Sequence, residues 1–113
     1  MTFIKSQFAL LLLLIMAFFM IFTGLDDSVL QIDEGADTFV STTILKSGVP
    51  MHSDGVNHTM LYADLFDGVF VYRTWIPYYL QSISLYFLGT NTFAARLPFA
   101  LGGLFSLWGL YHL

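Results

Sequence analysis

Residues 6–24 read SQFALLLLLIMAFFMIFTG, and none of these side chains is ionisable. A helix that crosses a bilayer needs roughly 20 apolar residues, because the hydrocarbon core is about 30 Å thick. The stretch therefore predicts a membrane-spanning helix. A secretory signal peptide has the same start, a basic residue (here Lys5) and then an apolar segment. We favour the uncleaved span, since the stretch is longer than an ordinary signal segment and residues 22–24 are not a small-residue cleavage site.

The composition agrees with a membrane protein. Hydrophobic residues make up 57% of the 113 residues and charged residues 11%, against about a quarter charged in a typical soluble domain. So few charges cannot cover a surface that faces water, whereas lipid needs no such cover. The chain has no Cys, which excludes disulfides and thiolate metal sites. Its four Lys and Arg residues form no basic patch for nucleic acid, so the expected partner is the lipid bilayer.

Two more apolar stretches follow a polar middle at 25–72. Residues 95–113 predict a third span, which stops at Leu113 and is expected to be truncated. Residues 74–89, TWIPYYLQSISLYFLG, predict the second span, with an aromatic cluster at one end that suits the membrane interface: Trp75, Tyr78 and Tyr79. The predicted fold is all-α and integral to the membrane. It has three transmembrane helices and one extramembrane loop, as the N-terminal part of a longer chain.

The loop at 25–72 is expected to carry short amphipathic helices. Gly48 suits the C-cap of the first, and Pro50 prevents its continuation. A second short helix is predicted around 59–66. The first is predicted over 34–47, along the membrane surface, from small or apolar residues at helical spacing: Ala36, Phe39, Val40, Thr43, Ile44 and Ser47.

The basic residues bear on orientation. Lys5 and Arg96 would lie on one side of the membrane, and Lys46 and Arg73 on the other. This equal number of basic residues on the two sides does not decide the orientation. The first helix often dominates, and Lys5 with the N-terminal amine favours a cytoplasmic N-terminus. The loop would then be extracytoplasmic, in the plasma or inner membrane, and Arg96 would be an anchor at the cytoplasmic face.

Asp33 and Glu34 are the side chains most suited to chemistry. They follow the first apolar stretch closely, so both should lie near the membrane surface. A carboxylate there can act as general base toward a hydroxyl or amine, or help hold a divalent cation near a phosphate. The structural alternative makes Asp33 the N-cap of the following helix and Glu34 a complement to its dipole. The dipeptide alone favours this alternative.

The remaining polar residues have simpler interpretations. Arg73 can pair with a lipid phosphate or a loop carboxylate, or extend to the interface as an anchor. His52 and His58 are a weak metal-site candidate, because no regular element fixes their spacing. The other acids are interpreted as solvated loop charge or as residues that fix the depth of the first span: Asp26, Asp27, Asp54, Asp64 and Asp67.

The order of these motifs resembles a known family. Residues 33–50, DEGADTFVSTTILKSGVP, resemble the first extracytoplasmic loop of the protein mannosyltransferase family, where an Asp-Glu pair, a short helix, a Gly and a Pro follow the first span. Residues 76–98, IPYYLQSISLYFLGTNTFAARLP, look like its second span. That family includes the bacterial lipid A aminoarabinose transferase and belongs to the GT-C class of glycosyltransferases. The resemblance covers roughly residues 7–113.

The resemblance implies an enzyme that passes a sugar from a polyprenyl-phosphate donor to a protein, lipid or polysaccharide acceptor. Asp33 would be the catalytic base on the acceptor, and Glu34 would support it or orient the acceptor. Arg73 is a candidate contact to the donor phosphate, and Arg96 would have a structural role. A divalent cation is the only cofactor in question.

Some features depart from the family. Its members have many more spans, so this chain by itself is expected to be inactive. Residues 35–37 stand where many relatives have Arg or Tyr, and residues 73–77 where many have Lys-Pro-Pro or Tyr-Pro-Pro, so donor or acceptor choice is expected to differ. Two alternatives stay open: a small non-enzymatic membrane protein or partner subunit that binds through its acidic loop, and a transporter fragment. The second is disfavoured, because the spans offer little polarity beyond Gln81 and hydroxyl groups.

Overall fold

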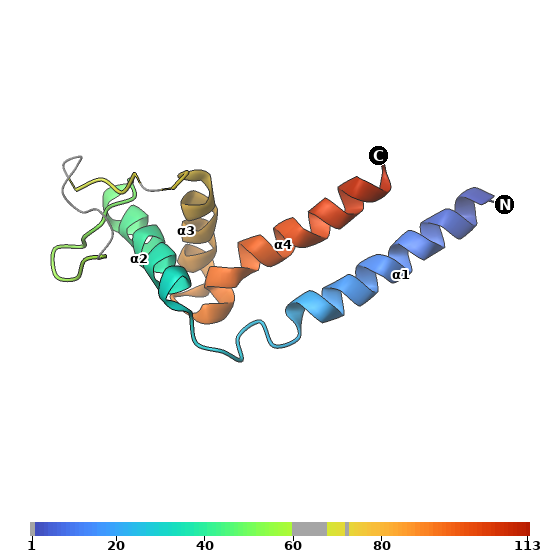
Figure 1. Ribbon diagram of the computed structural model, residues 1–113, viewed down its shortest axis with the longest axis horizontal. Coiled ribbons are helices and arrows are strands. Elements are labelled where there is room, and N and C mark those ends of the chain that lie inside the picture. The colour runs from blue at the N-terminus through green and yellow to red at the C-terminus, as the bar shows by residue number, and fades with distance from the viewer. Residues whose placement is uncertain (1, 60–67, 72) are drawn as a thin grey trace.

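The computed structural model describes residues 2–59, 68–71 and 73–113, and in this part of the chain the regular elements are all helices (Figure 1). The prediction of an all-α fold is confirmed. Between the second and third helices the described backbone forms isolated β-bridges, not strands. The helices are α1 (Thr2–Phe22), α2 (Ile32–Ser47), α3 (Ile76–Leu88) and α4 (Thr92–Tyr111).

The helices divide into two long ones and a small head. Helices α1 and α4 lie side by side, and both chain ends lie at the end remote from α2 and α3 (Figure 1). We call α2, α3 and the described residues between them the head. Helix α2 packs on α3, α3 packs on α4, and α4 packs on α1. The molecule is therefore elongated, with extents of 61 × 29 × 22 Å.

The structure does not support a span at 74–89. Helix α3 has 13 residues and rises only about 20 Å, short of the roughly 30 Å of a hydrocarbon core. Gly89, at φ 81°, ends the helix, and the Asn91 side chain accepts a hydrogen bond from the Ala94 N–H to begin the next one. The chain therefore turns back at the head instead of crossing to the far end.

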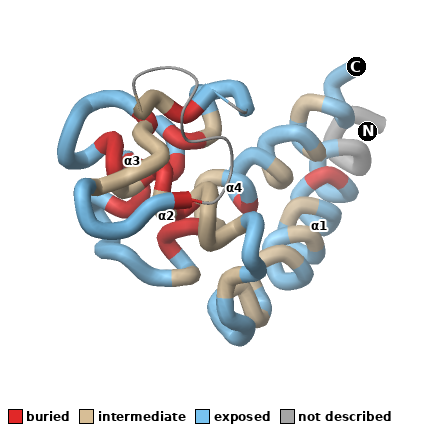
Figure 2. The backbone as a smooth tube through the Cα atoms, turned by 60° about the vertical axis from the view of Figure 1, so that its left-hand side comes forward, coloured by how far each residue is buried: buried red, intermediate tan, exposed pale blue. Residues whose placement is uncertain are grey.

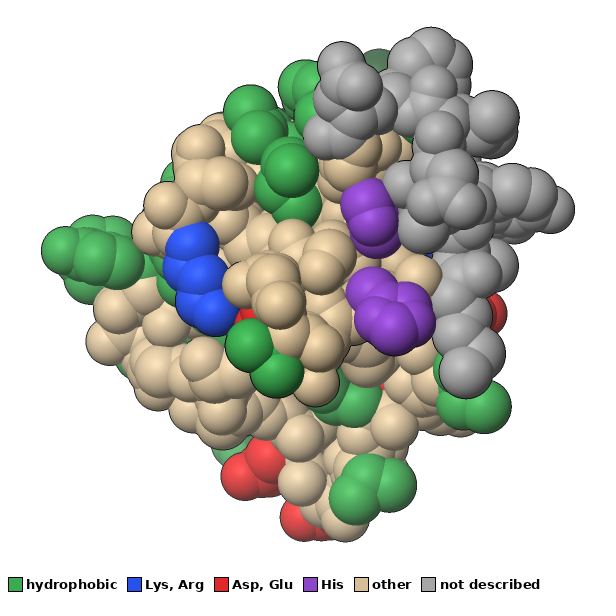
Figure 3. Space-filling model, turned by 90° about the vertical axis from the view of Figure 1, so that its left-hand side faces the viewer, with side chains coloured by type: hydrophobic (Ala, Val, Ile, Leu, Met, Phe, Trp, Pro, Cys, Tyr) green, Lys and Arg blue, Asp and Glu red, His purple; other side chains and the backbone are tan. Residues whose placement is uncertain are grey.

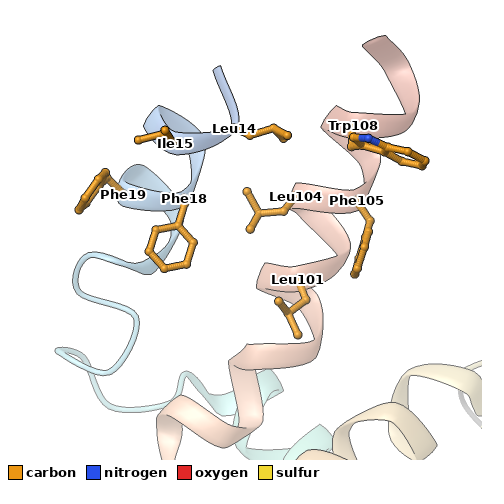
Figure 4. A pocket seen from close by; sticks show the side chains of 8 residues that line it. All are labelled: Leu14, Ile15, Phe18, Phe19, Leu101, Leu104, Phe105 and Trp108. Atoms are coloured by element: carbon orange, nitrogen blue, oxygen red, sulfur yellow. The ribbon is translucent and has the colours of Figure 1, made fainter. Parts of the chain in front are cut away.

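Helix α4 replaces the predicted third span and begins before residue 95. It has 20 residues and, in the described part of the chain, is the helix long and apolar enough to cross a membrane. The apolar part of α1, Gln7–Phe22, is shorter. A groove of about 530 Å³ runs between the two long helices, and Leu14 of α1 and Leu104 of α4 point into the space between them (Figure 4).

Pro98 lies inside α4 and alters its hydrogen bonding. Proline has no N–H, so the carbonyl four residues earlier, at Ala94, loses its helical donor. The Ser84 hydroxyl of α3 donates to that carbonyl at 2.7 Å. Gln81 of α3 donates in the same way to the Ala95 carbonyl at 2.9 Å. The polar residues of α3 therefore join it to the first turns of α4.

Helix α2 matches its prediction closely. It runs from Ile32 to Ser47, where 34–47 was predicted, and Gly48 adopts the left-handed conformation at φ 80°. A glycine tolerates this conformation because it has no Cβ. The buried face turns toward α3 (Figure 2) and consists of Thr38, Val40, Ser41, Thr43 and Ile44. Ser47, predicted on that face, is exposed. The second short helix, predicted at 59–66, falls outside the described residues apart from Thr59.

The aromatic cluster at the start of α3 makes contacts within the head. Tyr78 is buried, and its ring meets Phe70 edge to face with centroids 5.5 Å apart. Trp75 donates its indole N–H to the Phe70 carbonyl at 2.8 Å. The Tyr79 hydroxyl donates to the carbonyl of Gly48 at 2.9 Å. Each aromatic residue thus ties the start of α3 to a neighbouring part of the head.

Candidate functional site

The candidate site lies where α2 meets the first turns of α4. Glu34 is in the first turn of α2, and its carboxylate accepts two hydrogen bonds from Arg96: Nε to Oε1 at 3.1 Å and Nη2 to Oε2 at 2.8 Å. This paired geometry is the strongest that arginine makes with a carboxylate. The Gln31 N–H also donates to Glu34 Oε2, at 3.0 Å. Glu34 therefore joins the start of α2 to α4.

Arg96 also holds the connection between α1 and α2. Its Nη1 donates to the carbonyl oxygens of Leu25 at 2.9 Å and Ser28 at 3.3 Å, and to the Ser28 hydroxyl at 3.1 Å. A cation near a helix N-terminus opposes the helix dipole. Here the Glu34 carboxylate and these carbonyl oxygens compensate for it.

The prediction that Arg96 is an anchor on the side opposite the loop is wrong. Because α3 does not cross to the far end, α4 begins beside the head, and Arg96 lies against Glu34. Its side chain is only 17% exposed. Arg96 lies near the start of α4, as predicted, but this end of the helix is beside the head. The side-chain hydrogen bond from Arg96 is the main cause that lowers the pKa of Glu34 below its usual value.

Asp33 has a different environment from its neighbour. Its side chain is exposed and, within the described part of the chain, makes no hydrogen bond or ion pair. The prediction that it is the N-cap is wrong, because the helix begins at Ile32 and Gln31 is the N-cap. An open hollow of about 510 Å³ lies beside it, lined by Gln31, Ile32 and Asp33. The Asp33 carboxylate can therefore accept a proton from a molecule that enters this hollow.

Asp37, which the sequence analysis did not select, is the second charged centre of the head. Its carboxylate accepts a hydrogen bond from Arg73 Nη1 at 2.6 Å and from the Tyr78 hydroxyl at 3.1 Å. Burial is the main cause that raises the pKa of Tyr78, and the Asp37 charge adds to it. The sequence signal was the spacing, since Asp37 lies one turn after Asp33 and Glu34 on the same helix.

A cavity of about 80 Å³ lies at the junction of α2, α3 and α4. It holds Glu34 and Asp37 of α2 and Arg96 of α4, together with Gln81 of α3. Gln81 is buried and fully engaged: it accepts from the Ser41 hydroxyl at 2.6 Å and donates to the Thr38 hydroxyl at 3.2 Å, besides its bond to Ala95. The remaining lining is apolar: Leu30, Ala95 and Phe99.

The other predicted polar residues lie away from this junction. Asp54 accepts from the Asn57 and Val56 N–H groups and pairs with Lys46 at 3.2 Å, and these contacts lower its pKa. His52 Nδ1 lies 2.6 Å from the Gly68 carbonyl oxygen. Figure 3 shows the face of the head that is turned away from the long helices, where histidine side chains lie among polar side chains and backbone atoms.

The described residues bring no three His, Asp or Glu side chains together as a metal ion would require. Asp26 and Asp27 are exposed in the connection after α1. Two of the predicted loop acids, Asp64 and Asp67, lie outside the described residues. The candidate site is therefore the exposed Asp33 carboxylate and the Glu34–Arg96 pair that fixes the helix turn carrying it.

No protein-family model, curated protein or solved structure gives a significant match to this chain.

Proposed function

We propose that this chain is the N-terminal part of a membrane glycosyltransferase that uses a polyprenyl-phosphate sugar, similar to the protein mannosyltransferase family. The observation that carries the proposal is the Asp33 carboxylate, which is exposed and has no hydrogen-bonding or ionic partner among the described residues. It stands on a helix turn held by Glu34 and Arg96, at the position of the Asp-Glu pair in that family. The acceptor is a protein, lipid or polysaccharide, and the remaining donor contacts come from parts outside these 113 residues.

In this proposal α1 and α4 cross the bilayer as an antiparallel pair. Helix α4 has 20 residues and rises about 30 Å, which equals the usual hydrocarbon thickness. The apolar part of α1, Gln7–Phe22, rises about 24 Å. Val29 and Ile32, on either side of the turn into α2, are 87% and 93% exposed. Such exposed apolar side chains suit a membrane interface. The N-terminus is cytoplasmic and the head is extracytoplasmic.

The proposed chemistry needs a base and a clamp for phosphate. A polyprenyl phosphate leaves as an anion, so the donor needs no protonation of its leaving group. Asp33 takes the proton from the acceptor hydroxyl or amine as its oxygen or nitrogen attacks the sugar carbon. Glu34 acts as a positioning residue, because its carboxylate is already held by Arg96. Arg73 pairs with Asp37, and its contact to the donor phosphate stays a prediction.

The test is Asp33→Asn in the complete protein, assayed in membranes. Polyprenyl-phosphate mannose and polyprenyl-phosphate aminoarabinose are supplied separately, and sugar transfer is measured with the membrane level of the protein. Loss of a general base is expected to lower the rate by about 10²–10⁴-fold. The matched control is Asp26→Asn, an exposed acid of the preceding connection, which should retain the rate.

Two outcomes would count against the proposal. If Asp33→Asn retains sugar transfer, Asp33 is not the general base. If neither donor supports transfer by the unaltered complete protein, the alternative of a non-enzymatic membrane subunit is favoured. Its binding surface would then be sought on the acidic head.

A further inference from the structure

The outer face of α3 carries an apolar stripe that no other described element covers. Ile76, Leu80, Ile83 and Phe87 follow one another at helical spacing, and they are 72%, 51%, 55% and 76% exposed. The rest of α3 is buried against α2 and α4 and mixes apolar with polar side chains: Tyr78, Gln81, Ser82, Ser84 and Leu85. The polar side chains of α3 are therefore inside the protein, and its exposed stripe is apolar.

This stripe is continuous with the apolar surface of α4. The two helices together line a groove of about 540 Å³. Leu80, Ile83 and Phe87 form its α3 side, and Leu97, Leu101 and Phe105 are among the residues of its α4 side. The stripe thus adjoins the helix that has the length and composition of a membrane span.

The direction of α3 fits a membrane surface. It lies across the line of the two long helices, at the head end (Figure 1). Since the groove opens between α3 and α4, the stripe of α3 faces the space along which α4 extends. A helix that lies at the membrane interface buries its apolar face to a depth of about 5–10 Å. Helix α3, which is too short to cross, has the geometry of such a helix.

The charge distribution selects lipid over a water-soluble partner. From residue 74 to residue 113 the only Lys, Arg, Asp or Glu is Arg96. Arg96 is turned inward to Glu34 and is 17% exposed. The outer surface of α3 and α4 therefore offers hydrocarbon with almost no charge of its own, whereas the rim of a protein-binding patch is polar.

We propose that α3 is an interfacial helix whose stripe, Ile76, Leu80, Ile83 and Phe87, is covered by the acyl chains of the bilayer that α4 crosses. Helix α2 then lies on the water side of α3, and the head rests on the membrane through α3. The inference depends on the proposed insertion of α4 but not on glycosyl transfer.

Single-cysteine variants of the whole chain test this, because the protein has no Cys of its own. Phe87→Cys and Ile83→Cys place a nitroxide label on the stripe. Phe105→Cys places one on α4, at a side chain that is 70% exposed. Leu45→Cys is the matched control on α2, at an apolar side chain that is 45% exposed. Each protein is reconstituted into phosphatidylcholine vesicles, and collisions are measured with oxygen, which enters lipid, and with a water-soluble nickel chelate.

The expected result is that labels at 83 and 87 collide mainly with oxygen, at a shallower depth than the label at 105, while the label at 45 collides with nickel. If the label at 105 meets oxygen but those at 83 and 87 meet nickel, the inference about α3 fails alone. If the label at 105 also meets nickel, the proposed membrane insertion fails with it. Shielding of 83 and 87 from both reagents would show that protein covers the stripe and would overturn the inference.

Discussion

At the scale of residues, two adjacent carboxylates differ in what they contact. Successive side chains on a helix point about 100° apart, so Glu34 turns toward Arg96 while Asp33 turns to solvent. The pairing fixes the Glu34 carboxylate, whereas within residues 2–59, 68–71 and 73–113 the Asp33 carboxylate has no partner. A general base needs such an accessible acceptor, and a positioning residue needs the opposite.

The Glu34–Arg96 pair predicts acid sensitivity. Because the folded-state pKa of Glu34 lies below its ordinary value, the stabilisation is complete above the unfolded-state value of about 4.3. It is lost as the pH falls through the lower, folded-state pKa. We expect the melting temperature in detergent micelles to fall more steeply with acid in the unaltered protein than in Glu34→Gln. The difference should be modest and should shrink in high salt, because the Glu34 side chain is 41% exposed.

Arg96→Gln is the control for this prediction. Since it removes the partner and not the titrating group, it should return the Glu34 pKa toward its usual value and flatten the same part of the pH profile. Identical acid profiles in all three proteins would mean that the pair does not form in solution.

The sequence analysis selected Glu34 but could not identify its partner. Arg96 lies 62 positions further along the chain, and no local periodicity links residues at that separation. Asp37 was visible as a charge on the predicted helix, but its pairing with Arg73 depends on where α3 packs. Pairs of this kind follow from tertiary packing alone.

At the scale of elements, the bond from Ser84 to the Ala94 carbonyl predicts a compensating pair of substitutions. Ser84→Ala leaves this buried carbonyl without a donor, which costs about 1–3 kcal/mol. Adding Pro98→Ala should recover part of this loss, because residue 98 then supplies the missing helical N–H. Denaturant unfolding of the single and double variants in micelles measures the coupling. Additive effects of the two substitutions would contradict it.

The sequence predicted the elements unevenly. Helix α2 could be placed within two residues, because its periodicity, its charge at each end and Gly48 agree. Helix α3 was mistaken for a span, because the overall hydrophobicity of a stretch does not show which face of the helix is buried. The signal was present in the break of residues 89–91 and in the polar face of α3, where Gln81 and Ser84 bond to α4. In a helix surrounded by lipid, these polar side chains would have no hydrogen-bond partners.

At the scale of the molecule, the proposed insertion of α1 and α4 predicts that the connection between α3 and α4 lies on the same side of the membrane as the connection after α1. Single-cysteine variants at Asp27 and Thr90, both exposed, should react with a membrane-impermeant maleimide from one side. His112→Cys, at the end of α4, should react from the other. With three spans, Thr90→Cys would instead react from the side opposite to Asp27→Cys.

The hydrogen bonds of Arg96 to Glu34 and to the connection after α1 also affect the order in which the head can assemble. Glu34 leaves the ribosome 62 residues before its partner, which at about 5–20 residues per second is a delay of roughly 3–12 seconds. During that interval the nascent α2 has no cation to fix its first turn, and the connection after α1 has no guanidinium to gather its carbonyl groups. Assembly of the head must therefore wait for α4, and a chaperone or the insertion machinery has those seconds in which to act on it.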